Sequence, residues 1–453
     1  MKSYPKSFMN AMEELDFLED EIDTEGNIDH NGDKEYNFRL LCKNIPNTNY
    51  LTHNFHSYPA KFIPHIPNFL IRKYSARGET ILDPFCGSGT ALLEAKILGR
   101  NSIGIDINPL SYLITSVKTR EIRQDEINFI YQHLQKIKSA CMKKNIKPLI
   151  PDIPNINHWF SEKSQMSLGI LNAVINNMGE GIPDKIRDFF RLCFSAIIRK
   201  VSNADPKISK PFVSRMMREK ISNGQRPEEA APFFEQIVID YLKRLKELSG
   251  IVYQQFPQNK NVPFVKLLAN SDARKIDLSD ESVDFVITSP PYANAQEYFR
   301  SIQFELYWLG LATSDTLSFL KSTLVGTEKI NNHNSMPEKT HIPEIDECVS
   351  EIWNIDHKRG HIVKKYFTDM EKNIAECFRI LRKNKRYSIL VGDNIIRDVS
   401  VKTHLYIQEI GKRVGFDIDD VGYDIIKAYG LSPVRHHTAG IIDREWIITF
   451  LKH

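Results

Sequence analysis

The chain has 453 residues, 42% hydrophobic and 26% charged, which is ordinary for a globular protein with a full core. No run of about 18 apolar residues occurs, so we expect no membrane-spanning helix. The N-terminus turns acidic where a signal peptide would be apolar, and the six cysteines include no C-x-x-C pair. We therefore expect a cytoplasmic protein without a secretion signal, a zinc site or a disulfide framework.

The charge is unevenly spread along the chain. The net charge is +3, yet residues 1–33 hold ten acidic side chains against Lys2 and Lys6, a net of −8 that leaves +11 for the rest. We interpret residues 1–35 as an acidic flexible tail. An acidic arm on a basic body is typical of a protein that binds a polyanion.

The first dense region of structure follows the tail and predicts a βαβ unit. Residues 79–83 form a short apolar strand, a turn with glycines leads into a helix over 88–98, and residues 101–106 form a second strand. Pro109 opens another helix. This order is that of a parallel sheet.

The pattern then changes twice. Residues 120–258 are helical by period and contain no convincing strand, whereas strands return at 262–269, 283–288, 386–391 and 445–451, with an amphipathic helix over 361–382. The simplest account is one doubly wound, mostly parallel α/β sheet, with a first part at 36–119, a helical insertion at 120–258 and a second part at 259–453. The polar segment 312–360 is predicted to be an irregular cover over the pocket.

The segment D-P-F-C-G-S-G-T, residues 83–90, lies at the carboxyl end of the first strand, where open α/β sheets bind ligands. Gly87 and Gly89 permit a tight turn close to a ligand, and Ser88 and Thr90 can cap the following helix. Asp106, which ends the next strand, can accept hydrogen bonds from ribose hydroxyls. The loop lacks G-x-G-x-x-G spacing, and its leading acid would repel a pyrophosphate, so an adenosine carrying a sulfonium fits better than NAD.

This loop resembles the first motif of the DNA amino-methyltransferases, D-P-F-x-G-S-G-T. The resemblance implies a Rossmann-like methyltransferase fold with S-adenosylmethionine as cofactor. The cofactor-binding residues that it predicts in and after the loop are Asp83, Pro84, Phe85, Gly87, Ser88, Gly89, Thr90, Asp106, Ile107 and Asn108. Asp272, at the end of the third strand region, matches the acid of the family that contacts adenine.

Upstream, H-S-Y-P-A-K-F-I-P at residues 56–64 resembles an element that precedes this loop in many members of the family. Lys61 could pair with the cofactor carboxylate, and Tyr58 or Phe62 could pack against the cofactor. The alternative is that the aromatic rings belong to the core and that Lys61 is a surface charge.

The second motif is S-P-P-Y, Ser289 to Tyr292, delivered by a buried strand to the same edge of the sheet. Consecutive prolines stiffen the backbone and project carbonyls as acceptors. An exocyclic base amine is a poor nucleophile because its lone pair is delocalised, and acceptors aimed at its N–H bonds favour a more reactive, pyramidal nitrogen. Ser289 and the carbonyl of Pro290 are the candidate acceptors, Pro291 stiffens the loop, and Tyr292 would stack on a flipped base.

S-P-P-Y resembles the cytosine-N4 subgroup, whereas D-P-P-Y and N-P-P-Y are common among adenine-N6 enzymes, so we predict a cytosine-N4-specific DNA methyltransferase. Adenine N6 stays open, as do an RNA guanine-N2 or protein amide substrate and a DNA-binding regulator without catalysis. A carbon-5 enzyme is disfavoured, because no cysteine follows a proline. A cognate restriction endonuclease is an expected partner.

Double-stranded DNA is the expected substrate, and the insertion holds the strongest basic stretch. Residues 199–226 carry eight Lys or Arg against two acids, a net of +6 that can track phosphates. The predicted DNA-binding residues are Arg199, Lys200, Lys207, Lys210, Arg215 and Arg218. Asp393 is a further candidate for the target pocket. Arg300 is a candidate DNA or active-site contact, with a surface position as the alternative, and S-P-V-R-H-H-T at 432–438 is a candidate DNA loop.

Overall fold

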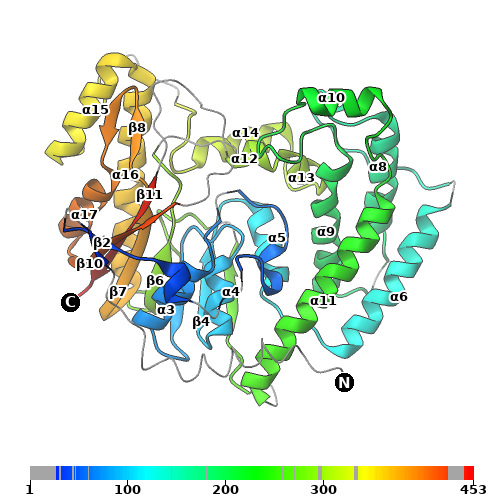
Figure 1. Cartoon of the computed structure of the whole chain (residues 1–453), viewed down its shortest axis with the longest axis horizontal. Helices are drawn as coiled ribbons and strands as arrows, with labels where there is room; N and C mark the ends of the chain where they lie inside the picture. Colours follow the sequence, from blue (N-terminus) through cyan, green and yellow to red (C-terminus); the bar gives the residue numbers. More distant parts are fainter. Residues whose placement is uncertain are drawn as a thin grey trace.

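The computed structural model describes residues 27–29, 32–42, 45, 47–59, 61–143, 145–179, 181–257, 260–269, 271–293, 298–330, 335–426 and 443–453. A twisted sheet lies on one side of the molecule and a group of long helices on the other, with the short helices α12–α14 between their upper ends (Figure 1). Among the described residues, no helix is both long and apolar enough to cross a membrane.

A nine-stranded sheet carries the fold, in the order β1-β2-β10-β11-β7-β6-β3-β4-β5. Its strands are β1 (Asn27–Ile28), β2 (Lys34–Glu35), β3 (Thr80–Asp83), β4 (Asn101–Ile105), β5 (Val265–Leu268), β6 (Val283–Thr288), β7 (Leu381–Val391), β10 (Asp417–Ile425) and β11 (Arg444–Leu451). Strands β7, β6, β3, β4 and β5 are parallel to one another, whereas β11 is antiparallel to both β7 and β10. The predicted doubly wound, mostly parallel sheet is confirmed.

Helices cover both faces of the sheet because the central strands are apolar on both sides. In β6, whose residues are all buried, Phe285 and Ile287 pack with α3 (His65–Tyr74) and α4 (Thr90–Ile97). Val286 points to the opposite face, which is covered by α15 (Pro343–Ile355), α16 (His357–Ile380) and α17 (Thr403–Val414). A continuous apolar run is the pattern expected of a strand buried on both faces.

The sequence analysis missed β10. Its sequence, DIDDVGYDI, alternates acidic and apolar residues, and several of its side chains are exposed. It lies beside β11 near the edge of the sheet, where one face can stay wet, so the apolar run that identified β6 is absent. The hairpin of β8 (Asn394–Ile396) and β9 (Val399–Val401) was missed as well.

The segment 312–360 is not the irregular cover that its polarity predicts. Thr313 caps α14 (Ser314–Thr323) through its side chain, and Pro343 stands in the first turn of α15. These capping residues mark helix starts that a reading by polarity alone overlooked. The prediction of an irregular segment was therefore wrong.

Most of the helices between residues 124 and 255 pack around one apolar core, in which α10 has no residue. The helices of this range are α6 (Gln124–Cys141), α7 (Ile156–Trp159), α8 (Glu162–Asn176), α9 (Asp184–Ile198), the 3-10 helix η2 (Arg199–Val201), α10 (Arg215–Ser222) and α11 (Ala231–Gln255). The same core takes in α5 (Pro109–Lys118) from the sheet side and α13 (Gln303–Trp308) from beyond β6. Trp308, almost fully buried, packs edge-on against Phe160 and Phe194. The helical group is thus continuous with the α/β part.

The end of the acidic segment reaches the sheet. Strand β2 pairs with β10, and the Asp420 carboxylate on β10 accepts hydrogen bonds from Tyr36, from Lys73 at 2.9 Å and from Tyr74 at 3.2 Å. The tail predicted over residues 1–35 therefore includes, at its C-terminal end, residues that extend the sheet. This acidic side chain holds the extension against α3.

Replacing Asp420 with alanine should lower the free energy of unfolding by about 1–3 kcal/mol, because two phenols and two ammonium groups lose a half-buried acceptor. Urea unfolding followed by circular dichroism measures the change. Asp417→Ala is the matched control on the same strand, since its carboxylate is 71% exposed and pairs with an exposed His453. That variant should stay within about 0.5 kcal/mol of the wild type. Equal shifts for the two variants would contradict the assigned role.

Candidate active site

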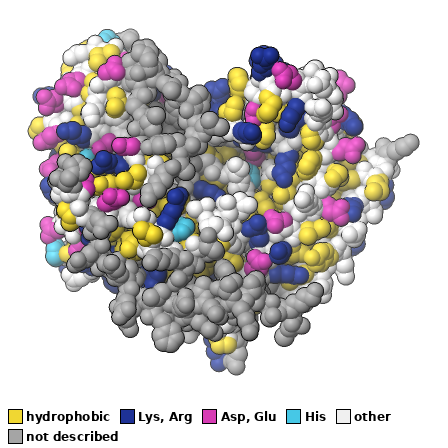
Figure 2. Space-filling model, in the orientation of Figure 1, with side chains coloured by type: hydrophobic (Ala, Val, Ile, Leu, Met, Phe, Trp, Pro, Cys, Tyr) yellow, Lys and Arg dark blue, Asp and Glu magenta, His cyan; other side chains and the backbone are white. Residues whose placement is uncertain are grey.

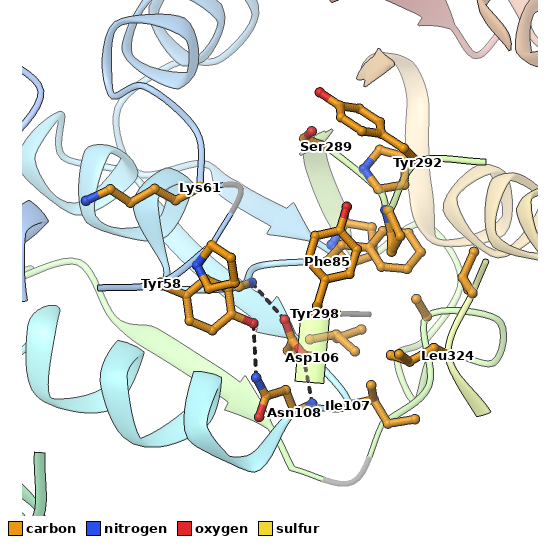
Figure 3. Close-up of a pocket in the computed structure, with 18 of the residues that line it drawn as sticks. Tyr58, Lys61, Phe85, Asp106, Ile107, Asn108, Ser289, Tyr292, Tyr298 and Leu324 are labelled. Atoms are coloured by element: carbon orange, nitrogen blue, oxygen red, sulfur yellow. Dashed lines mark hydrogen bonds between the residues drawn. The ribbon is translucent and has the colours of Figure 1, made fainter. Parts of the chain in front are cut away.

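A cavity of about 300 Å³ opens at the carboxyl ends of the parallel strands. It lies where the strand order reverses between β3 and β6, the place where open α/β sheets bind ligands. Most of the predicted site residues line it, namely Tyr58, Lys61, Phe62, Pro84, Phe85, Gly87, Asp106, Ile107, Asn108, Asp272, Ser289, Pro290, Pro291 and Tyr292. Figure 3 shows the two predicted loops on opposite sides of this space.

The loop after β3 turns at two glycines. Gly87 and Gly89 have φ values of +49° and +72°, in the left-handed region that favours glycine. A Cβ atom on Gly89 would stand 2.5 Å from the Thr115 methyl carbon, and one on Gly87 would stand 3.2 Å from the Tyr58 ring. The loop therefore fits between α5 and the Tyr58 ring only with glycine at both positions.

Asp106, at the end of β4, organises the wall of the cavity. Its Oδ2 accepts from the Gly87 amide at 2.9 Å and its Oδ1 from the Asn108 amide at 2.8 Å (Figure 3). Burial raises the pKa of Asp106 to about 6, although these two amide bonds favour the ionised form. Each oxygen has a second lone pair, so the carboxylate can still accept from a ligand hydroxyl.

Asp83 lies behind the cavity and does not line it. Its Oδ1 accepts from Thr288 Oγ1 at 2.7 Å and from the Phe85 amide at 3.1 Å. Burial raises the pKa of Asp83 to about 7. The side chain thus ties the end of β3 to the end of β6, and it would act on a ligand through the loops that it holds.

Ser88 and Thr90 also lie away from the cavity, and they do not cap α4. The N-cap is Gly89, without a side-chain hydrogen bond, because its left-handed conformation already turns the chain into the helix. The capping prediction was wrong. Ser88 contributes its carbonyl instead, which accepts from Lys118 Nζ at 2.9 Å.

The upstream element supplies one wall of the cavity. The Tyr58 hydroxyl accepts from Asn108 Nδ2 at 3.1 Å and lies 2.8 Å from Ser111 Oγ. The stem of Lys61 lines the cavity, but its ammonium group extends away from it and donates to the His53 carbonyl at 3.0 Å (Figure 3). Tyr58 is therefore placed to contact a ligand, whereas Lys61 would have to change rotamer to meet a carboxylate.

Asp272 lines the far end of the cavity together with Arg274. The Arg274 guanidinium pairs with Asp272 at 2.6 Å and with Asp369 at 3.1 Å, and it donates to the Thr323 carbonyl at 2.8 Å. Burial opposes ionisation of Asp272, but the bonds from Arg274 hold its pKa below the usual range. Arg274 thereby fixes the segment after α14 as part of the cavity wall.

The loop after β6 places Ser289 and both prolines on the cavity, with Tyr292 beside them. The Tyr292 hydroxyl donates to Glu445 Oε1 at 2.6 Å. Beyond the predicted set, the cavity is lined by Arg274, Tyr298, Phe299, Thr323, Leu324, Val325, Ile426 and Glu445, among others. No motif predicts these residues, although Arg274 stands two positions after Asp272.

The predicted DNA-binding residues separate into two groups. Arg199 donates to the carbonyls of Ile208 at 2.7 Å and Ser209 at 2.9 Å, so it holds the loop that leads to α10. Lys210 is partly buried, whereas Lys200, Lys207, Arg215 and Arg218 are exposed. Figure 2 shows Lys and Arg side chains around α10, interspersed with acidic and hydrophobic ones.

Of the three further candidates, Asp393 and the exposed Arg300 do not line the cavity, and the third is a segment outside the described residues. Asp393 pairs with His404 at 2.7 Å and does not line the cavity. The S-P-V-R-H-H-T segment at 432–438 lies outside the described residues.

Comparisons with known proteins agree with this geometry. Residues 9–115 match the family model for DNA methylases of the N6/N4 type. The chain is 28% identical to the type II methyltransferase M.MvaI of Kocuria varians, over 81% of this chain and 82% of that one. The type II methyltransferase M.BsoBI of Geobacillus stearothermophilus is 25% identical over 87% and 82%, and M.MjaII of Methanocaldococcus jannaschii is 36% identical over 54% and 60%.

The chain belongs to the DNA amino-methyltransferase family. It is an S-adenosylmethionine-dependent DNA methyltransferase. The cavity fits this cofactor, because Gly87 exposes backbone on its wall, the Asp106 carboxylate has free lone pairs for hydroxyl groups, and apolar side chains lie on the wall with Asp272.

Affinity of the methyltransferase for S-adenosylmethionine should fall as the pH drops through about 6. We expect the ionised Asp106 carboxylate to accept from ribose hydroxyls and the protonated one to do so poorly, so the dissociation constant should rise up to about tenfold per pH unit below the pKa. Calorimetric titrations between pH 5 and 7.5 measure this change, a range in which the lowered pKa keeps Asp272 ionised.

Asp106→Asn is the matched variant for these titrations. It should bind the cofactor more weakly at pH 7.5 and show a flatter profile. A flat profile in the wild type would contradict the role given to this carboxylate.

Proposed function

We propose that the protein transfers a methyl group from S-adenosylmethionine to N4 of a flipped cytosine in duplex DNA, as the protective enzyme of a restriction–modification system. The observation that carries this proposal is the shared cavity. Ser289 to Tyr292 after β6 face the same space as Gly87 and Asp106 of the cofactor wall. An amine held at Ser289 would therefore lie beside a methyl donor bound against the glycine loop.

The loop after β6 would activate the amine by accepting hydrogen bonds from its two N–H groups. Ser289 Oγ and the carbonyl of Pro290 are the acceptors, and Pro290 and Pro291 have no N–H to compete with them. The cofactor supplies an electrophilic methyl group on its sulfonium when bound. Holding amine and methyl group in line could contribute about 7–11 kcal/mol of barrier reduction, so no covalent intermediate is needed.

Cofactor contacts follow from the cavity wall. Asp106 would accept from the ribose hydroxyls, Tyr58 would pack beside the glycine loop, and Asp272 would accept from the adenine amine. Arg274 already pairs with Asp272. The Asp272 end of the cavity would therefore bind adenine without an unpaired negative charge.

Cytosine is favoured over adenine by the serine of S-P-P-Y, through its resemblance to the cytosine-N4 subgroup. Adenine N6 is the second candidate, since either amine presents two N–H groups to the same acceptors. The restriction–modification context rests on the relatives, which are named as type II methyltransferases. A regulator without catalysis is disfavoured, because Asp106 and the S-P-P-Y residues lie intact on one cavity.

The direct test incubates the protein with labelled S-adenosylmethionine and mixed-sequence duplex DNA, then identifies the methylated nucleoside by mass and retention. We expect N4-methylcytosine. Ser289→Ala should lower kcat about 100-fold through the lost acceptor, and Tyr292→Ala about 10- to 100-fold through the lost stacking. Ser279→Ala, an exposed serine before β6, is the control and should leave kcat unchanged.

The product decides between the candidates. N6-methyladenine would overturn the base assignment and keep the mechanism. Cofactor binding without methylation of any DNA would overturn the proposed function.

The grip on duplex DNA is assigned to α10 and the loop before it. Arg215 and Arg218 lie on this helix, and the Arg215 side chain is 94% exposed. Lys207 lies exposed on the preceding loop, which Arg199 holds in place. These side chains would contact phosphates while the target base enters the cavity at a cost of a few kcal/mol.

The double variant Arg215→Ala/Arg218→Ala should reduce the slope of log binding constant against log salt by up to about 2, since each phosphate contact contributes about 0.9. Fluorescence anisotropy with a labelled duplex at several salt concentrations measures the slope. Lys383 is exposed near the start of β7, at the end of the strand away from the cavity. Lys383→Ala should leave the slope unchanged. An unaltered slope in the double variant would place the phosphate contacts elsewhere.

A further inference from the structure

A carboxyl group that belongs to neither motif lines the catalytic side of the cavity. Glu445 stands at the start of β11, far from the S-P-P-Y segment in sequence. Because β11 runs antiparallel to β7, its first residues lie at the edge where β6 and β7 end. The topology thus brings an acid from the last strand to the loop after β6.

Glu445 binds one partner there, the Tyr292 hydroxyl, which donates to Oε1 at 2.6 Å. In the described part of the chain no ion pair to Glu445 accompanies this bond. Burial accordingly raises the pKa of Glu445, while the bond from Tyr292 favours its ionised form. A carboxyl in such a position that pairs with no cation of the described residues needs a reason other than charge pairing.

Tyr292 is fixed at both of its ends. Its carbonyl oxygen lies 3.2 Å from where a Cβ atom on Gly326 would stand, so the backbone packs closely against that residue. At the other end, the hydroxyl is held by Glu445. Without this acceptor the ring could rotate about its side-chain bonds, and a buried phenol would lose its partner.

We propose that Glu445 is the positioning residue of the target-base pocket, which holds the Tyr292 ring in the orientation that stacks on the flipped base. This inference rests on the proposed function, since a stacking platform has meaning only for a base substrate. Glu445 acts through Tyr292 and needs no contact with the reacting atoms. A platform held at both ends costs no reorganisation when the base arrives.

A double-mutant cycle on the full-length protein tests this role, with kcat, the KM for duplex DNA and the dissociation constant of S-adenosylmethionine as readouts. Glu445→Ala should lower kcat about 10- to 100-fold, as expected for a misplaced contact, and leave the cofactor constant within about twofold. Glu445→Gln should recover a large share of kcat, because its amide oxygen still accepts from Tyr292. Glu347→Ala, exposed on α15, controls for the loss of a carboxylate.

The coupling decides the outcome. Tyr292→Phe removes the donor, so adding Glu445→Ala to it should lower kcat no further. Additive losses, a Gln variant as poor as the Ala variant, or a weakened cofactor affinity would each overturn the inference while methylation by the wild type upholds the proposed function. A wild type that methylates no DNA overturns both, and is distinguished by that result alone.

Discussion

One buried hydrogen bond, from Thr288 Oγ1 to Asp83 Oδ1 at 2.7 Å, joins the ends of the two central strands. It stands where the strand order reverses, so the loop after β3 and the loop after β6 leave the sheet from one fixed point. With Asp83 fully buried, the bond replaces the water that a carboxyl of this kind would otherwise need. The sheet thereby sets the distance between a methyl donor that would bind at the loop after β3 and an amine that would bind at the loop after β6.

The glycine loop is also held from behind. Lys118 Nζ donates to the Ser88 carbonyl, and Thr115 Oγ1 lies 3.3 Å from the Gly87 carbonyl. Burial lowers the pKa of Lys118 to about 7, and the nearby Glu94 carboxylate partly opposes this shift. Glu94 itself is surrounded by donors, among them Asn68 Nδ2 at 2.8 Å. These buried polar contacts specify one loop conformation, which an apolar backing would leave undetermined.

The sequence was enough to predict the central strands, both loops and the residues that carry the motifs. Strand β6 could be found because most of its residues are apolar, and Gly87 and Asp106 because their spacing is typical of a ligand site. Arg274 and Glu445 could not, since they reach the cavity through tertiary contacts and not through a local pattern. Asp83 was expected at the ligand, yet its role is to tie two strands, because a motif does not say which side of a loop a carboxylate faces. The charge of Arg199 predicts a phosphate contact, but in the structure its guanidinium donates hydrogen bonds to loop carbonyls.

Helix α5 connects the core of the helical group to the glycine loop. Its residues Leu110, Ile114 and Val117 belong to the core of the helical group, while Thr115 and Lys118 hold the glycine loop. The α13 helix, which follows the catalytic loop, packs into the same core through Trp308. Since close-packed interiors transmit displacement with little compression, the helices of this core cannot shift far without moving both loops. The target base would therefore be presented to a cavity whose geometry is already fixed, and adjustment would fall on the DNA.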